Sequence, residues 1–334
     1  MKKLLCSLVA GMFCVALGDA VRYGVRVVDS LTGLPVPGVE VKAGFEEDMG
    51  LFVRDRYKYT FHMYETDMNG CAKIWGTSNT AKTGATVVRA EGYYCPARGG
   101  IPQFVSKNIF GVWQPDDLVV TIKLQRVEHP IPLFVKRELL NVKQEIANIN
   151  GGKFSYDMMM GEWLPPFGNG KIADIEFTRM PHLEFTEVVG ASGVKGRPYR
   201  DAVAVRFVNA DNGLVEWQSP MGNFLKIRTA PEDGYDSDYL CWEGRGDDLR
   251  HSTNYDKNRC FLFRIRTERD DKGRIKESYY GKIYGDIVAY TGPHNIILGV
   301  MFTYYLNPTS LDRNLEWDMQ NNLCPNPGDV PKEP

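Results

Sequence analysis

The sequence predicts an all-β chain organised as two domains. Apolar and polar side chains alternate in parts of Val25–Val41 and again over Cys260–Arg269, which is the period of a strand with one buried and one solvent-facing side. Clusters of glycine, proline, asparagine and aspartate separate such segments and predict turns. With 334 residues, of which 43% are hydrophobic, the chain is long enough for two cores.

Residues 1–20 are predicted to form a secretory signal peptide. Lys2 and Lys3 give a short cationic head, and the apolar run Leu4–Leu17 that follows is too short to span a bilayer. We therefore expect an exported chain that is periplasmic, at the cell surface or secreted. No transmembrane segment is expected in its mature part, because no later apolar run is long enough.

The first domain is expected over residues 21–127. A strand, a turn and a second strand follow one another in Val25–Val41, and Pro35 and Pro37 must lie in the turn or at an edge because proline has no backbone donor. This segment predicts a hairpin-like start to a β-sandwich. Thr66–Gly70 predicts a tight turn. Further strands are expected at three places: Cys71–Trp75, Ala85–Ala90 and Leu118–Leu124.

These motifs resemble those of the carboxypeptidase regulatory-like domain, a transthyretin-like, Ig-like β-sandwich. In that family the first strand is followed by D-x-x-T-G-x-P-V-P-G-V-x-V, and the matching residues here are Asp29, Thr32, Gly33, Pro35, Val36, Pro37, Gly38, Val39 and Val41. The turn at Thr66–Gly70 and the pair Gly92–Tyr93 also resemble the family. The resemblance covers about the first third of the chain and implies a noncatalytic scaffold or binding role.

Two segments of this domain exceed what a minimal sandwich needs. Phe45–Tyr64 and Ile101–Pro115 are longer and more aromatic, and long loops are common sites of binding residues. Phe110 and Trp113 either form an exposed contact there or pack over the end of the sandwich.

Residues 128–152 are expected to form a linker. His129–Pro132 carries two prolines, which interrupt regular structure. Within Leu139–Ile149 the apolar residues recur at helical spacing, which predicts a short helix. The alternative is a strand over Leu133–Leu140.

Residues 153–324 are expected to form a larger antiparallel β domain. A turn at residues 209–213 predicts a hairpin between Ala202–Val208 and Leu214–Trp217, and Asp270–Gly273 turns Cys260–Arg269 back into Ile275–Ile287. Ile296–Leu306 is apolar on both faces, so it predicts a central strand covered on both sides. Another strand is expected at Ile172–Thr178.

The end of the chain gives two further expectations. Residues 304–318 resemble a stretch found in uncharacterised exported bacterial proteins, and no activity follows from that resemblance. Residues 325–334 are rich in proline and charge, which predicts a disordered tail.

Five cysteines lie outside the signal peptide: Cys71, Cys95, Cys241, Cys260 and Cys324. Export makes disulfides feasible, and the odd number leaves at least one thiol free or paired between chains. Cys71 with Cys95 and Cys241 with Cys260 are candidate pairs. Spacing does not fix the connectivity, and small buried thiols are the equal alternative.

The sequence holds no motif for catalysis, a metal or a cofactor. Its histidines are scattered singly, and there is no H-E-x-x-H, G-x-S-x-G, P-loop or dinucleotide fingerprint. With 40 basic and 42 acidic residues the chain has no basic footprint for nucleic acid. The acidic loop at residues 232–238 is either a calcium site or a solvated turn, and its spacing departs from an EF-hand.

The sequence favours an exported noncatalytic binding or scaffold protein with a glycan or protein partner. Aromatic side chains near loops of the second domain are the candidate ligand-binding residues, because amphipathic rings stack on sugars or anchor partners. They are Trp163, Tyr239, Trp242 and Trp317. Tyr235, in the acidic loop, belongs to the same set of aromatic residues. The alternatives are a carbohydrate-active hydrolase using Glu162 and Glu216, or an assembly subunit that pairs exposed sheet edges.

Overall fold

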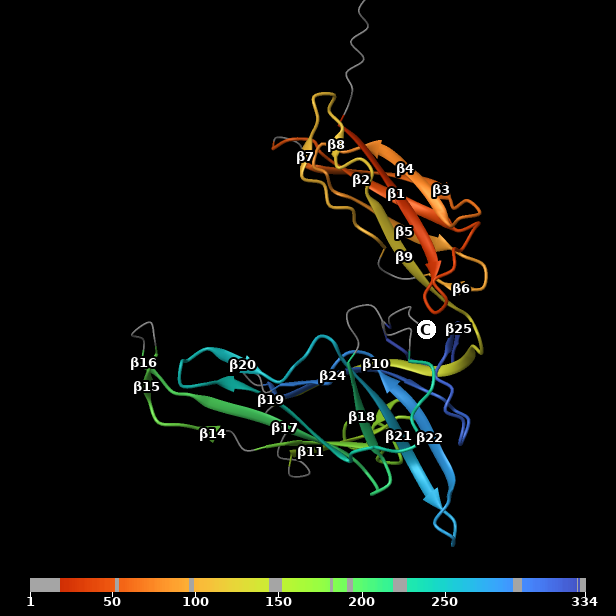
Figure 1. Cartoon of the computed structure of the whole chain (residues 1–334). Helices are drawn as coiled ribbons and strands as arrows, with labels where there is room; N and C mark the ends of the chain where they lie inside the picture. The colour runs from red at the N-terminus through yellow and green to blue at the C-terminus, as the bar shows by residue number, and fades with distance from the viewer. Residues whose placement is uncertain are drawn as a thin grey trace, which may run out of the picture. The chain divides into compact units, whose positions relative to one another are not determined.

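The computed structural model describes residues 19–51, 54–95, 99–143, 152–180, 183–190, 195–218, 227–290, 296–328 and 330, without the side chains of 141–143, 290 and 296–298. Apart from Gly152, which has a 3-10 conformation, every helix or strand assigned in these ranges is a β-strand, so the predicted all-β fold is confirmed (Figure 1). In the described ranges there is thus no helix able to cross a membrane. The predicted signal peptide lies outside them up to residue 18. The chain divides into two compact units, one ending at Val127 and the other beginning at Glu128.

Unit 1 is a two-layer β-sandwich. Its four-stranded sheet has the order β4-β1-β9-β6 and its three-stranded sheet the order β3-β2-β5, while β7 and β8 form a separate pair. The core between the layers includes Val25 and Val27 from β1 and Val41 and Phe45 from β2, all at most 1% exposed. The strands are β1 (Ala20–Asp29), β2 (Glu40–Asp48), β3 (Tyr57–Glu65), β4 (Cys71–Thr77), β5 (Thr83–Arg89), β6 (Tyr93–Tyr94), β7 (Ser106–Lys107), β8 (Trp113–Gln114) and β9 (Val119–Arg126).

The hairpin predicted for Val25–Val41 is wrong, although both of its strands exist. β1 pairs with β4 and β9, whereas β2 pairs with β3 and β5 in the other sheet. The proline-containing segment between them crosses from one layer to the other. Before it crosses, the Val36 amide donates to the carbonyl of Val27 at 3.0 Å.

Unit 2 also stacks two sheets. One has the order β18-β21-β22-β24-β10-β25 with β23 on β24, the other has the order β12-β11-β13-β17-β19-β20 with β14 on β17, and β15 pairs with β16. Its strands are β10 (Ile131–Lys143), β11 (Lys153–Asp157), β12 (Glu162–Trp163), β13 (Ile175–Arg179), β14 (Leu183–Glu184), β15 (Val188–Val189), β16 (Lys195–Gly196), β17 (Tyr199–Phe207), β18 (Gly213–Gln218), β19 (Asp238–Arg245), β20 (His251–Thr253), β21 (Arg259–Arg269), β22 (Ile275–Ile283), β23 (Val288–Tyr290), β24 (Ile296–Leu306) and β25 (Trp317–Asn322).

The predicted central strand is confirmed as β24, which lies between β22 and β10. Phe302 and Tyr304 point into the core between the two sheets, where the ring of Phe302 stacks on Phe177 at 5.7 Å. Tyr305 points the opposite way into a second core with Leu315 and is fully buried. The hairpin between β21 and β22 is confirmed as well.

Other predictions for unit 2 are wrong. The expected linker at 128–152 contains β10, so the strand alternative holds and the helix over Leu139–Ile149 does not form up to Lys143; residues 144–149 lie outside the described ranges. The turn at residues 209–213 does not close a hairpin, because β17 and β18 belong to different sheets. The tail predicted to be disordered is ordered in part: the carbonyl of Pro327 accepts the Arg137 amide at 3.0 Å and Val330 packs on the second core.

All five cysteines of the described residues are free thiols, so neither candidate disulfide forms in this structure. Cys241 lies in the core between the two sheets, whereas Cys260 lies in the second core. Both are small side chains buried among apolar neighbours, and burial raises the pKa of the Cys241 thiol. In this structure Cys241 and Cys260 are therefore small buried thiols, which was the alternative to a disulfide.

Candidate binding surface

Four large apolar side chains form an exposed row along β3 of unit 1. Tyr57, Tyr59, Phe61 and Met63 are 41%, 54%, 57% and 56% exposed. They alternate along the strand, so they lie on one face of the three-stranded sheet. We call this row the β3 stripe. Such a row is unusual, because exposed apolar groups are normally scattered singly.

The alternate side chains of β3 hold the strand on the sandwich. The imidazole of His62 packs edge-on against Phe45, with ring centroids 5.5 Å apart. The hydroxyl of Tyr64 donates to the carbonyl of Trp75 at 2.5 Å. The stripe therefore faces away from the core because the residues between its members face the core.

Among the residues that the structure describes, β3 is also an edge strand whose outer backbone groups are unpaired. It pairs only with β2, and the bonds Met49 N to Arg56 O at 2.7 Å and Thr66 N to Val39 O at 3.0 Å fix which residues bond inward. In an antiparallel pair these bonded positions alternate, so the even-numbered residues of β3 bond to β2 and the odd-numbered residues face the open edge. In the described residues no hydrogen bond reaches the edge-facing groups. The stripe and the open edge are thus formed by the same residues.

Charged groups flank the stripe. The ammonium of Lys42 lies 4.1 Å from the centroid of Phe61, and Lys82 lies 5.2 Å from that of Tyr57. The Tyr59 hydroxyl donates to Glu46 at 2.5 Å, and Lys82 pairs with the same carboxylate at 3.1 Å. The hydrogen bond from Tyr59, with further support from Lys82, holds the pKa of Glu46 below its ordinary value.

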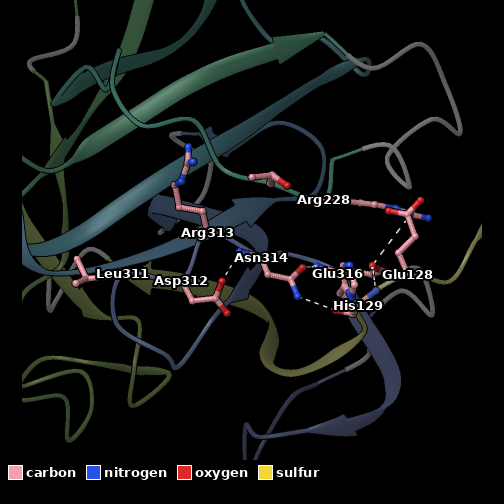
Figure 2. A pocket seen from close by; sticks show the side chains of 9 residues that line it. Glu128, His129, Arg228, Leu311, Asp312, Arg313, Asn314 and Glu316 are labelled. Atoms are coloured by element: carbon pink, nitrogen blue, oxygen red, sulfur yellow. Dashed lines mark hydrogen bonds and ion pairs between the residues drawn. The ribbon is translucent and has the colours of Figure 1, made fainter.

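A cavity of about 530 Å³ lies in unit 2 (Figure 2). The Glu316 carboxylate, which is 3% exposed as a residue, accepts the backbone amides of Glu128 at 2.9 Å and His129 at 2.8 Å. Asn314 Nδ2 donates to the His129 carbonyl at 2.6 Å. The lining residues are Glu128, His129, Arg228, Thr229, Leu311, Asp312, Arg313, Asn314 and Glu316.

The charges of this cavity are used within the fold. Arg228 pairs with Glu128 at 2.7 Å, and Arg313 pairs with Glu232 at 2.9 Å. Among the lining residues the one hydroxyl, that of Thr229, makes no hydrogen bond to His129 or to a carboxylate. The hydrogen bonds around the cavity therefore join the segment before β10 to the loop before β25. Its described lining residues include no nucleophile that is hydrogen-bonded to a base.

The structure does not bring the predicted ligand-binding aromatics together. Trp163 and Trp317 are each 4% exposed and lie in different cores, so neither presents a face for stacking. Tyr239 and Trp242 are half-buried on β19. Arg259 donates to the Tyr239 hydroxyl at 2.5 Å, and the Arg200 guanidinium lies 4.4 Å from the Trp242 ring. Ligand binding by these two residues stays a prediction.

The other predicted sites are also dispersed. Glu162 and Glu216, the two carboxylates of the hydrolase alternative, lie on β12 and β18 in different sheets, and neither lines the cavity. In the acidic loop Asp238 pairs with Arg206 at 2.7 Å. The part of the chain that the structure describes holds no group of three or more His, Cys, Asp or Glu placed to bind a metal.

The β3 stripe was missed because it falls within Phe45–Tyr64, which the sequence presents as a long aromatic loop. The alternation of Tyr57, Tyr59, Phe61 and Met63 with polar residues is visible in the sequence. It places the apolar side outward, opposite to the usual rule for a half-buried strand.

No family model matches the chain, and no curated protein matches it. Among solved structures it is similar to the full-length major pilin SpaD of Corynebacterium diphtheriae, with 9% identity and a TM-score of 0.24 over 89% of this chain and 83% of that chain. It is also similar to BcpA, the major pilin subunit of Bacillus cereus, with 8% identity and a TM-score of 0.22 over 85% of this chain and 95% of that one. A likeness this weak carries no inference about function. The resemblance to the regulatory-like family stays a prediction.

Proposed function

We propose that the chain is an exported, noncatalytic surface protein that binds other polypeptides by adding a strand to the edge of β3. The observation that carries this proposal is the coincidence of four exposed apolar side chains with an open edge on one nine-residue strand. The assembly role, rather than hydrolysis, is the alternative that this observation favours.

Strand addition uses both features. An incoming extended segment bonds to the unpaired backbone groups, which supplies affinity, while its alternate side chains contact the stripe, which supplies specificity. Each backbone bond contributes a net stabilisation of about 0.5–1.5 kcal/mol. An exposed apolar edge strand is otherwise a liability for aggregation, and proteins usually shield it with charge, proline or a covering loop.

A glycan partner has less support at this surface. Stacking on sugar needs open ring faces, but cations lie over the rings of Phe61 and Tyr57. Their displacement would cost part of the binding free energy.

Amide hydrogen exchange of the full chain tests the proposal. The probe is a short synthetic peptide of alternating threonine and valine with lysine at both ends, and its control carries proline at every position between the lysines. We expect the first peptide to slow exchange at the amides of Tyr59, Phe61 and Met63, and the proline peptide to have no effect because it lacks donors. A peptide that binds without slowing these amides would contradict strand addition at β3.

A thermal-shift screen against soluble glycans tests the competing partner class. A ligand that binds the native state raises the melting temperature, so we expect no glycan to do so. A glycan that stabilises wild type but not Tyr59→Ala would replace the proposal with glycan binding at the stripe.

A further inference from the structure

We infer that the strand added to β3 is the β3 strand of a second copy of this chain, paired antiparallel about a two-fold axis at Phe61. This inference rests on the proposed function and names its partner. Two-fold pairing of identical surfaces is the commonest arrangement in soluble oligomers.

The backbone of β3 allows this pairing without rearrangement. β3 runs from Tyr57 to Glu65, so Phe61 is its central residue. Antiparallel pairing centred there places Phe61 opposite Phe61 of the second copy and Tyr59 opposite Met63. All of these residues direct their amides and carbonyls to the open edge. Each amide of one copy therefore faces a carbonyl of the other.

The side chains are compatible in the same register. On the outer face the two stripes join into one apolar row, with an aromatic pair at the axis and a sulfur-aromatic contact on each side of it. On the inner face Lys58 lies opposite Tyr64, and Thr60 lies opposite His62. No like charges oppose each other within the paired strands.

Two considerations favour this register and this partner. Only the register centred on Phe61 pairs all nine residues of each β3, since a shift by two residues leaves residues of both strands unpaired. Because β3 is complementary to itself in this register, the β3 strand of any second copy of the chain is a suitable partner. One strand from each copy is a small interface, below the roughly 1,600 Å² buried in a stable complex, so the dimer is expected to be weak.

Sedimentation velocity of the full chain between about 1 μM and about 1 mM tests the inference. We expect wild type to shift reversibly from monomer to dimer as the concentration rises. Phe61→Lys and Phe61→Glu each place two like charges at the axis and should stay monomeric at every concentration. An equimolar mixture of the two variants places opposite charges there and should form the dimer again.

The control is Val88→Lys, because Val88 is 42% exposed on β5 of the same sheet but lies away from the β3 edge. It should dimerise as wild type does. Phe61 is already 57% exposed, so its variants should melt within about 3 °C of wild type, which excludes misfolding as the cause of a lost dimer.

Three other outcomes would each overturn one part of the inference: the second copy as partner, β3 as the interface, or the register centred on Phe61. A wild type that stays monomeric up to about 1 mM overturns homotypic pairing, yet the proposed function survives if the threonine-valine peptide still protects the edge. A dimer that Phe61→Lys leaves intact forms elsewhere on the chain. Two monomeric variants that do not associate when mixed contradict the register at Phe61.

Discussion

At the residue scale, Asp29 shows how a sequence motif becomes a stabilised turn. Its carboxylate accepts the amides of Leu31 and Thr32, both at 2.9 Å, and the hydroxyl of Tyr93 at 3.1 Å. The bond from the Thr32 amide is the main reason why the pKa of Asp29 lies below its ordinary value of 3.8. The aspartate of the D-x-x-T-G motif was predictable as a turn residue, but its bond to Tyr93, 64 positions away, was not.

Asp29→Asn should destabilise unit 1 and weaken its response to acid. A depressed pKa in the folded state means that the ionised carboxylate stabilises the protein above the ordinary pKa and that this stability is lost as the pH falls through the folded value. We expect a loss of about 1–2 kcal/mol at neutral pH and a flatter decline below about pH 4. Denaturant unfolding between pH 2 and 7 measures both. Asp116→Asn, an exposed change in the same unit, is the control, and equal acid sensitivity in both variants would refute the role of Asp29.

Arg266 joins the two sheets of unit 2 through two buried carboxylates. Its guanidinium lies 2.6 Å from Asp157 Oδ1 and 2.9 Å from Asp174, and both carboxylate side chains are 1% exposed. Arg266 adopts a φ of 52° next to a register shift in β21, which turns it out of the regular strand alternation. Sequence periodicity presents this arginine as a solvent-facing residue of the strand, so the buried ion pair could not be predicted from it.

Arg266→Met should destabilise unit 2 by about 3–5 kcal/mol, because it leaves two buried carboxylates without their cation. The control is Arg269→Met on the same strand, where the pair with Asp211 is 41% and 34% exposed. That change should cost at most about 1 kcal/mol. Chemical denaturation of both variants measures the difference, and similar small losses in the two would show that the buried pair adds little.

At the element scale, the strands were predictable but their partners were not. The turns at residues 29–38 and 209–213 carry the residues typical of hairpins, yet each chain segment passes from one sheet to the other. A turn residue satisfies a local backbone conformation, and the same residues suit a hairpin or a crossing. Partner choice depends instead on the apolar face that the next strand buries, which is a property of the whole unit.

β10 shows why the helix prediction failed. It is paired on both sides, with β24 and β25, and Leu133 and Val135 are fully buried while Phe134 packs on the opposite core. A strand covered on both faces has no clean alternation of apolar and polar residues. The apolar positions that remained in its second half fell by coincidence at helical spacing.

Gly281 lies where β22 packs close against its neighbours β21 and β24. A Cβ there would lie 2.1 Å from Phe263 Cζ and 2.4 Å from the Tyr305 carbonyl oxygen. Gly281→Ala should therefore cost about 3 kcal/mol or more, because the backbone of β24 cannot move aside. Gly246→Ala, whose nearest contact would be 3.6 Å away, should change stability by less than about 1 kcal/mol. Thermal unfolding compares the two, and an unchanged melting temperature for Gly281→Ala would show that β22 is not tightly packed.

At the scale of the whole molecule, the candidate site was hidden by the rule that places apolar residues inside. Trp163 and Trp317 became candidates as amphipathic rings near loops, but the structure buries both of them in cores, as that rule expects. The β3 stripe breaks the rule, since its large apolar residues face solvent. The exposure of these side chains is a property of the assembled sandwich. β3 is held by its pairing with β2 and by the core contacts of its other side chains, so the stripe residues need not be buried.

The proposed function requires that the outer edge of β3 is open in the single chain and closes when a partner strand is added. Amide hydrogen exchange of the full chain at two concentrations measures both states of this edge. We predict that the amides of Tyr59, Phe61 and Met63 exchange rapidly in dilute solution and slow down at high concentration, while those of Thr60 and His62, bonded to β2, stay protected throughout. Protection of all five amides that does not change with concentration would show that the edge is already closed within a single chain, and β3 could then receive no partner strand.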